Sequence, residues 1–210
     1  FPVLFVSFTL LVWLIDGIGA RPGADRHGKV KKSFGAILPA ALLGWLFGFG
    51  YFLAGLYWVG AAFLVEADKF AVFLPLAVVV FPAGLALFFA AGVALAMPFW
   101  SPGWTRIIAL AVGLTFAEWL RGHIFTGFPW NQIGYALTGF EPFLQSASVI
   151  GVEGLTFVSI LVFSTPAVMG SMGSVSARIR LIPFLLGAAV LRIMTLFGMP
   201  RIPDHLQPLF

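Results

Sequence analysis

Long uncharged apolar runs alternate along the chain with short charged or Pro- and Gly-rich breaks, a pattern typical of membrane-spanning helices. A helix needs about 20 residues to cross the hydrocarbon core of a bilayer. The pattern therefore predicts an all-α integral membrane protein, folded as one bundle of about six transmembrane helices. The predicted spans are residues 1–15, 34–65, 70–97, 107–120, 149–169 and 181–197, followed by a tail at 198–210.

The second predicted span is longer than a bilayer requires. Residues 34–65 carry no charge, so we expect this helix to tilt, or to bend near Pro39. Gly44 and Gly48 lie four residues apart within it, a spacing that lets helix backbones approach closely in lipid. We interpret these glycines as packing positions, with a glycine-lined lipid groove as the alternative.

Composition narrows the class of protein further. Hydrophobic residues make up 60% of the chain and charged residues 10%, which excludes a water-soluble globular domain and a disordered chain. The net charge of +4 comes without a basic stripe, so we expect no nucleic-acid partner. Cysteine is absent, which excludes disulfides, thiolate metal sites and any thiol nucleophile within these residues. The three histidines fall in separate loops, so we expect no metal and no cofactor.

Lysine and arginine are distributed unequally between alternate loops, which predicts the orientation of the bundle. One set of loops holds eight basic residues and the other holds three, with Arg192 inside a span. Because positive residues accumulate on the cytoplasmic side, the richer set is cytoplasmic. We therefore expect loop 16–33 to be cytoplasmic and loop 122–148 to be periplasmic.

The segment EWLRGHIFTGFPWNQIGY, residues 118–135, contains the best candidate site. Glu118 and Arg121 are three residues apart, so they share a helix face. Either they form a snorkelling pair that anchors the helix at the membrane boundary, or they bind the head group of a substrate. Beyond them, glycines and Pro129 interrupt the helix while the aromatic residues keep the segment apolar. Irregular backbone at membrane depth must be buried in protein or line a cavity.

The order EWLRG, TGFPW, IGY and IGVEG, starting at residues 118, 126, 133 and 150, resembles bacterial apolipoprotein N-acyltransferase. The glycine-aromatic block that ends at Trp58 matches too. The resemblance implies a bacterial inner-membrane bundle beneath a periplasmic nitrilase-like domain. In that family a catalytic Cys, assisted by a Glu and a Lys, takes an acyl chain from a phospholipid. It then passes the chain to the α-amino group of an apolipoprotein. The implied partners are membrane phospholipid and, in a complete enzyme, an apolipoprotein.

The resemblance assigns lipid- or substrate-binding candidates residue by residue. They are Glu118, Arg121, Gly127, Phe128, Pro129, Trp130, Tyr135 and Glu153. No catalytic residue is carried over, because the chain has no Cys and only a short tail where the family has its nitrilase-like domain. We therefore expect a truncated form in which the catalytic half is missing and which is inactive alone. His123 falls inside the motif, and we interpret it as a hydrogen-bonded residue that fills space, not as a ligand.

Two other classes of function remain open. The first is a non-catalytic integral membrane subunit of a larger complex, which would bind other subunits. The second is a transporter, in which Glu153 would serve as an intramembrane proton-relay carboxylate. For Trp130 the choice lies between a lipid-facing wall and a belt residue that only fixes depth in the membrane.

Overall fold

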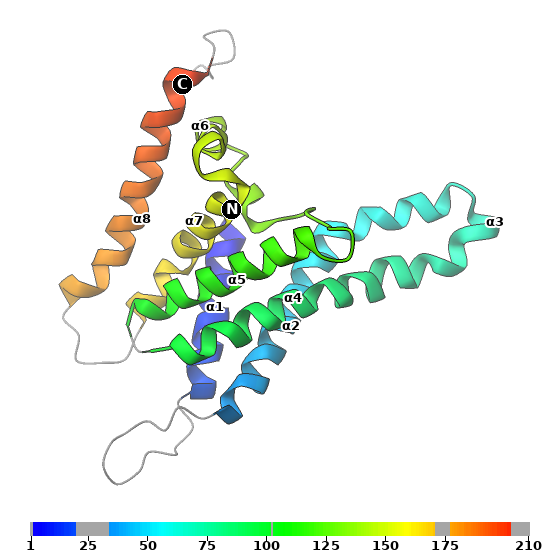
Figure 1. Ribbon diagram of the computed structural model, residues 1–210, viewed down its shortest axis with the longest axis horizontal. Coiled ribbons are helices and arrows are strands. Elements are labelled where there is room, and N and C mark those ends of the chain that lie inside the picture. Colours follow the sequence, from blue (N-terminus) through cyan, green and yellow to red (C-terminus); the bar gives the residue numbers. More distant parts are fainter. Residues whose placement is uncertain (1, 20–33, 102, 171–176, 203–210) are drawn as a thin grey trace. The chain divides into compact units, whose positions relative to one another are not determined.

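The computed structural model describes residues 2–19, 34–101, 103–170 and 177–202, and every regular element within these ranges is helical (Figure 1). The predicted all-α fold is therefore confirmed. Each predicted span overlaps one long helix. Most of the predicted cytoplasmic loop, with His27, and the end of the tail, with His205, lie outside the described residues. The long helices are α1 (Pro2–Gly19), α2 (Ile37–Leu56), α4 (Phe81–Ala96), α5 (Thr105–His123), α7 (Ala147–Met169) and α8 (Ala177–Gly198), and the short ones are α3 (Ala67–Phe70) and α6 (Glu141–Gln145).

Several helices have the length and composition of membrane spans. Among the described residues, four segments are long and apolar enough to cross a bilayer: Ile37–Leu64, Ala67–Phe99, Ala147–Met169 and Leu181–Arg201. Val3–Ile18 is a shorter apolar helix. Large apolar side chains on these helices are widely exposed, as expected where lipid is the solvent. The chain is an integral membrane protein.

The chain divides into two compact units. Unit 1 comprises Phe1–Val12, Ser101–Ala111 and Gln132–Phe210. Unit 2 comprises Trp13–Trp100 and Val112–Asn131.

Unit 2 is built on a long hairpin in which α2 and α4 lie side by side (Figure 1). Both glycines of the predicted packing motif are buried in this contact. A Cβ on Gly44 would lie 2.7 Å from Val93 Cγ2, and one on Gly48 would lie 2.8 Å from Phe89 Cβ. Larger side chains would separate the helices, so the packing interpretation is correct for these two residues. Gly92 of α4 makes an equally close backbone approach to Gly113 of α5.

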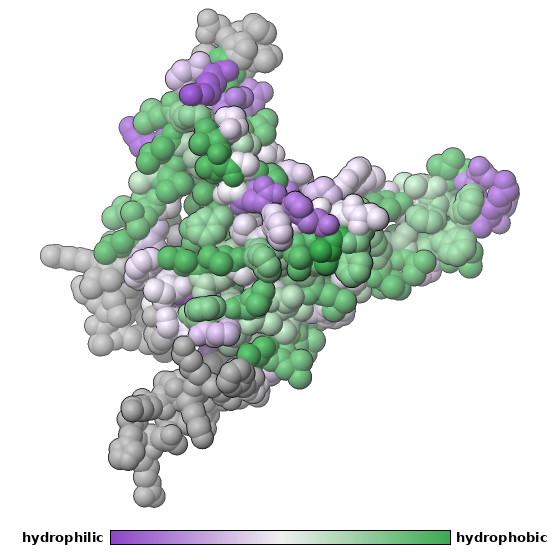
Figure 2. Space-filling model, in the orientation of Figure 1, coloured by the Kyte–Doolittle hydropathy of each residue, from purple (hydrophilic) through white to green (hydrophobic). Residues whose placement is uncertain are grey.

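The hairpin continues beyond α2 as irregular helix. Tyr57–Leu64 is 3-10 helix, and the returning arm of this helical hairpin contains a π-helix at Leu76–Val80, directly after Pro75. Pro39 lies in the first turn of α2, where a missing N–H breaks no helical hydrogen bond, and the expected tilt or bend of this span stays a prediction. Figure 2 shows an apolar surface along this hairpin and a hydrophilic patch at the α3 end.

Unit 1 contains α6, α7 and α8. Two features interrupt α7: Gly151, with φ 68° and ψ 179°, and Pro166. Pro166 cannot donate to the carbonyl of Val162, and the Thr165 hydroxyl donates to that oxygen at 2.8 Å instead. Near the end of α7, the guanidinium of buried Arg106 donates to the carbonyl of Ala167 at 3.1 Å. A cation at this position complements the negative end of the helix dipole.

Candidate functional site

The last turns of α5 place two charges inside unit 2. Glu118 and Arg121 are each 1% exposed, and Arg121 Nη2 lies 3.6 Å from Glu118 Oε1. The guanidinium also lies over the ring of Phe52, with its central carbon 5.0 Å from the ring centroid. The snorkelling interpretation is therefore wrong, because the pair is enclosed by protein. Opposite charge and the aromatic face offset part of the large cost of desolvating these groups. Contact with a lipid head group remains a prediction.

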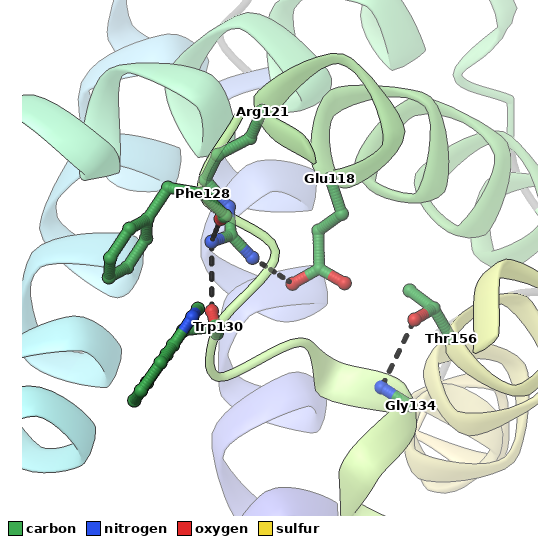
Figure 3. Close-up of polar contacts among 6 residues, drawn as sticks. All are labelled: Glu118, Arg121, Phe128, Trp130, Gly134 and Thr156. Atoms are coloured by element: carbon green, nitrogen blue, oxygen red, sulfur yellow. Dashed lines mark hydrogen bonds and ion pairs between the residues drawn. The ribbon is translucent and has the colours of Figure 1, made fainter. Parts of the chain in front are cut away.

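Arg121 holds the segment that follows α5. Its Nη1 atom donates to the carbonyl oxygens of Phe128 and Trp130, the latter at 2.8 Å (Figure 3). In the other direction, the Phe128 N–H donates to the Arg121 carbonyl at 2.9 Å. Both the side chain and the backbone of Arg121 therefore bind this segment. We call residues 124–131 the clamped loop.

The clamped loop has an unusual backbone. Phe125, Thr126 and Gly127 are consecutive residues with positive φ, of 51°, 75° and 78°, and Asn131 follows with 54°. Glycine and asparagine tolerate this conformation, whereas a β-branched residue such as Thr126 is strained in it. Gly127 is required for a second reason, because a Cβ there would collide with the carbonyl oxygen of Gly122. Strained residues of this kind persist only where surrounding contacts fix them.

Two aromatic side chains of the clamped loop pack against two from the hairpin, and we call the four the aromatic cluster: Trp58, Phe81, Phe128 and Trp130. The rings of Trp58 and Trp130 stack at 5.6 Å between centroids, and those of Phe128 and Trp130 stack at 6.1 Å. Phe81 meets Phe128 edge to face at 5.0 Å. The clamped loop is thereby joined to both arms of the long hairpin within unit 2.

The aromatic cluster presents an apolar, partly exposed surface. Trp58 is 48% exposed and Trp130 is 54% exposed. The indole N–H of Trp58 donates to the Gly55 carbonyl at 3.0 Å, so this ring offers a ligand mainly its apolar faces. Stacked indoles of this kind suit the acyl chain or the interfacial region of a lipid. None of these groups is a nucleophile, so the arrangement can bind but cannot form a covalent acyl intermediate.

The remaining sequence candidates lie in unit 1. Tyr135 is 46% exposed and follows Gly134, whose N–H donates to Thr156 Oγ1 at 3.1 Å (Figure 3). Glu153 is half-buried in the first helical turn after Gly151, where a carboxylate complements the helix dipole. The structure therefore brings six of the eight candidates together in unit 2 and places these two in unit 1.

His123 makes local contacts only. Its Nδ1 donates to the Trp119 carbonyl at 2.6 Å, and its ring stacks on the Trp119 indole with centroids 4.5 Å apart. The hydrogen bond expected for this histidine is present, and the absence of a ligand-binding role stays a prediction. Among the residues that the structure describes, no group of three or more His, Cys, Asp or Glu could hold a metal ion.

Sequence reasoning missed three aromatic contributors to the site. Phe52 supports the guanidinium, and Trp58 and Phe81 complete the aromatic cluster. The resemblance already included the block ending at Trp58, which was a usable signal. The sequence contains no such signal for Phe52 or Phe81, because each is one Phe among 24 in a uniformly apolar chain.

Comparisons with known proteins identify the family of this chain. Residues 1–165 match the family model described as the apolipoprotein N-acyltransferase N-terminal domain. The chain is 50% identical over 197 residues to the apolipoprotein N-acyltransferase of Rhodopseudomonas palustris, covering 94% of this chain and 34% of the relative. The Rhizobium meliloti protein of the same name is 46% identical, and the match covers 99% of this chain and 38% of the relative. The Brucella suis protein of the same name is 48% identical, and the match covers 98% of this chain and 37% of the relative.

The chain spans a little over a third of the length of these curated relatives. The family model covers most of the chain, including the clamped loop, the aromatic cluster and both buried charges. The chain therefore belongs to the apolipoprotein N-acyltransferase N-terminal domain family.

Proposed function

We propose that this chain is the membrane part of an enzyme that transfers an acyl chain from a phospholipid to the N-terminus of an apolipoprotein. Its own task is to bind the donor phospholipid against the aromatic cluster. The observation that carries the proposal is the partly exposed stack of Trp58 and Trp130, in which Trp130 belongs to a loop whose backbone is held by a buried charge. The names of the relatives supply the reaction class.

The chemical step needs groups that these residues do not contain. Transfer through a covalent acyl intermediate requires a nucleophile such as a thiolate, and the 210 residues include no Cys. We therefore expect the catalytic thiol that the family resemblance implies to lie outside these residues. We expect the purified 210-residue chain to show no N-acylation of a lipid-modified peptide, and turnover by this chain alone would overturn the proposed division of labour.

The proposal includes an orientation in the bacterial inner membrane. Loop 16–33 is cytoplasmic and loop 122–148 is periplasmic, supported by the eight-to-three division of basic residues. Because the chain lacks Cys, single-Cys variants can be labelled without background. In intact cells we expect an impermeant thiol reagent to label position 131 and not position 27. The reverse pattern would refute the orientation.

The lipid-binding role is tested by comparing two tryptophans of unit 2. Trp130 belongs to the exposed stack, whereas Trp45 lies within α2 and donates its indole N–H to the Ala83 carbonyl at 3.0 Å. We expect Trp130→Ala to reduce bound phospholipid, measured by native mass spectrometry, more than it lowers thermal stability. Trp45→Ala should affect stability alone. If the two variants lose stability equally and Trp130→Ala keeps its lipid, Trp130 is only a depth anchor.

A non-catalytic subunit of a larger membrane complex is the alternative, and it makes different predictions. It requires other chains to co-purify in fixed proportion, and it gives Trp130 no special effect on lipid. The same native mass spectra report both quantities, so one experiment separates the two functions.

A further inference from the structure

We infer that Arg121 is a positioning residue, which shapes the lipid-binding surface by fixing the backbone that carries Phe128 and Trp130. In the same inference, Glu118 orients the Arg121 guanidinium. The inference rests on the proposed function. It assigns to the buried charge pair a task at the site, in place of direct contact with a lipid head group. The first observation is burial: at 1% exposed, neither charge reaches the surface that Trp130 presents at 54%.

The second observation is the geometry of the guanidinium. Its Nη1 atom donates to two carbonyl oxygens that flank Pro129, those of Phe128 and Trp130. Both aromatic rings of the clamped loop are therefore attached to backbone that Arg121 holds. Arginine suits this task because its donors are arranged in a rigid planar group, whereas lysine presents a compact point charge on a flexible stem.

The third observation is that local conformational preference does not hold the loop by itself. Phe125 and Thr126 adopt left-handed backbone that L side chains rarely occupy. Such conformations persist only when neighbouring contacts over-determine them. The carbonyl contacts of Arg121 and the hydrogen bond from the Phe128 N–H to the Arg121 carbonyl supply that constraint.

The role of Glu118 follows from its position one turn before Arg121. The carboxylate lies 3.6 Å from Nη2, on the opposite branch of the guanidinium from the Nη1 atom that binds the loop. Phe52 covers the guanidinium at 5.0 Å. An ion pair on one branch and an aromatic ring over the plane leave the guanidinium little freedom to rotate, so Nη1 stays directed at the carbonyls.

The test reads the order of Trp130 directly. The full chain in phosphatidylethanolamine and phosphatidylglycerol nanodiscs carries 5-fluorotryptophan, and a Trp130→Phe variant assigns the Trp130 fluorine resonance. We expect one narrow Trp130 line in the parent protein. In Arg121→Lys and in the charge-free double variant Glu118→Gln/Arg121→Met, the line should broaden or split, while the Trp45 line stays unchanged. Phospholipid binding should weaken about fivefold or more, the lower end of typical coupling between linked sites.

Arg106 provides a matched control for loss of a buried arginine. It also donates to a backbone carbonyl, that of Ala167, but in unit 1. We expect Arg106→Lys to lower the melting temperature and to leave the Trp130 line and lipid binding unaltered.

The outcomes separate this inference from the proposed function. An unchanged Trp130 line in both Arg121 variants, or equal broadening in Arg106→Lys, refutes the positioning role. If Trp130→Ala itself leaves phospholipid binding unchanged, the proposed function fails instead. If the double variant does not fold, Arg121→Lys alone decides, because it keeps the positive charge opposite Glu118.

Discussion

Replacing Gly127 by Ala should destabilise unit 2 more than its single added methyl group suggests. Gly127 has φ 78°, which an L side chain rarely adopts. A Cβ at this position would also meet the carbonyl oxygen of Gly122, in the last turn of α5. The substitution therefore combines a backbone penalty with a collision against backbone rather than against a flexible side chain.

The magnitude follows from these two terms. The left-handed conformation costs a non-glycine residue about 1–2 kcal/mol. Forcing an extra carbon into a closely packed position costs about 1–3 kcal/mol more. The turn cannot move freely to relieve the collision, because the Gly127 N–H donates to the Ile124 carbonyl at 2.9 Å. We expect a total loss of about 2–5 kcal/mol, equivalent to a fall of roughly 4–20 °C in melting temperature for a chain of this size.

Thermal unfolding in detergent, followed by circular dichroism, measures this loss. Gly84→Ala is the matched control, because Gly84 lies exposed on α4 and a Cβ there would meet no atom within 4 Å. Alanine is the better helix former by about 1 kcal/mol, so this variant should melt no lower than the parent. Gly127→Asn separates the two terms, since asparagine tolerates left-handed backbone and retains only the collision. Equal melting temperatures for Gly127→Ala and Gly84→Ala would refute the reasoning.

Two further substitutions test contacts elsewhere in the chain. Gly151→Ala should cost about 1–3 kcal/mol, because the φ of 68° and ψ of 179° at this kink are open essentially to glycine alone. Thermal unfolding measures this loss, and a melting temperature equal to that of the parent would contradict it. Gly48→Leu should separate α2 from α4, where a Cβ would already lie 2.8 Å from Phe89. A disulfide between engineered cysteines on the two helices should then form more slowly, whereas Gly50→Leu, at a position with open space, should leave the rate unchanged.

Much of the architecture could be predicted from the sequence, because hydropathy reports directly on what a bilayer accepts. The positions of the long helices and the packing role of Gly44 and Gly48 follow from apolar length and small-residue spacing. The break after α5 was also visible, since Gly127 and Pro129 cannot continue a helix. What hydropathy does not encode is helix type: the transition at Tyr57 and the π-helix at Leu76–Val80 occur in residues as apolar as their neighbours.

The motif predicted which residues come together in unit 2, but it did not predict the environment of their charges. A Glu and an Arg three residues apart near the end of a span have the same spacing whether they face water or protein. These charges are enclosed by protein because Phe52, some seventy residues earlier, covers the guanidinium and because Arg121 binds two loop carbonyls. Such contacts depend on tertiary packing, which the spacing of residues along one helix does not determine.

The segment from Glu118 to Trp130 forms a single physical unit in which each part requires the next. Left-handed backbone and Pro129 remove the regular hydrogen bonds that would satisfy the loop carbonyls. An arginine supplies two bonds from one nitrogen, but its buried charge then needs a counter-charge, which Glu118 provides. With the carbonyls held, Phe128 and Trp130 can stack in fixed positions beside Trp58. A rigid aromatic surface of this kind loses little conformational entropy when a lipid binds, which favours binding.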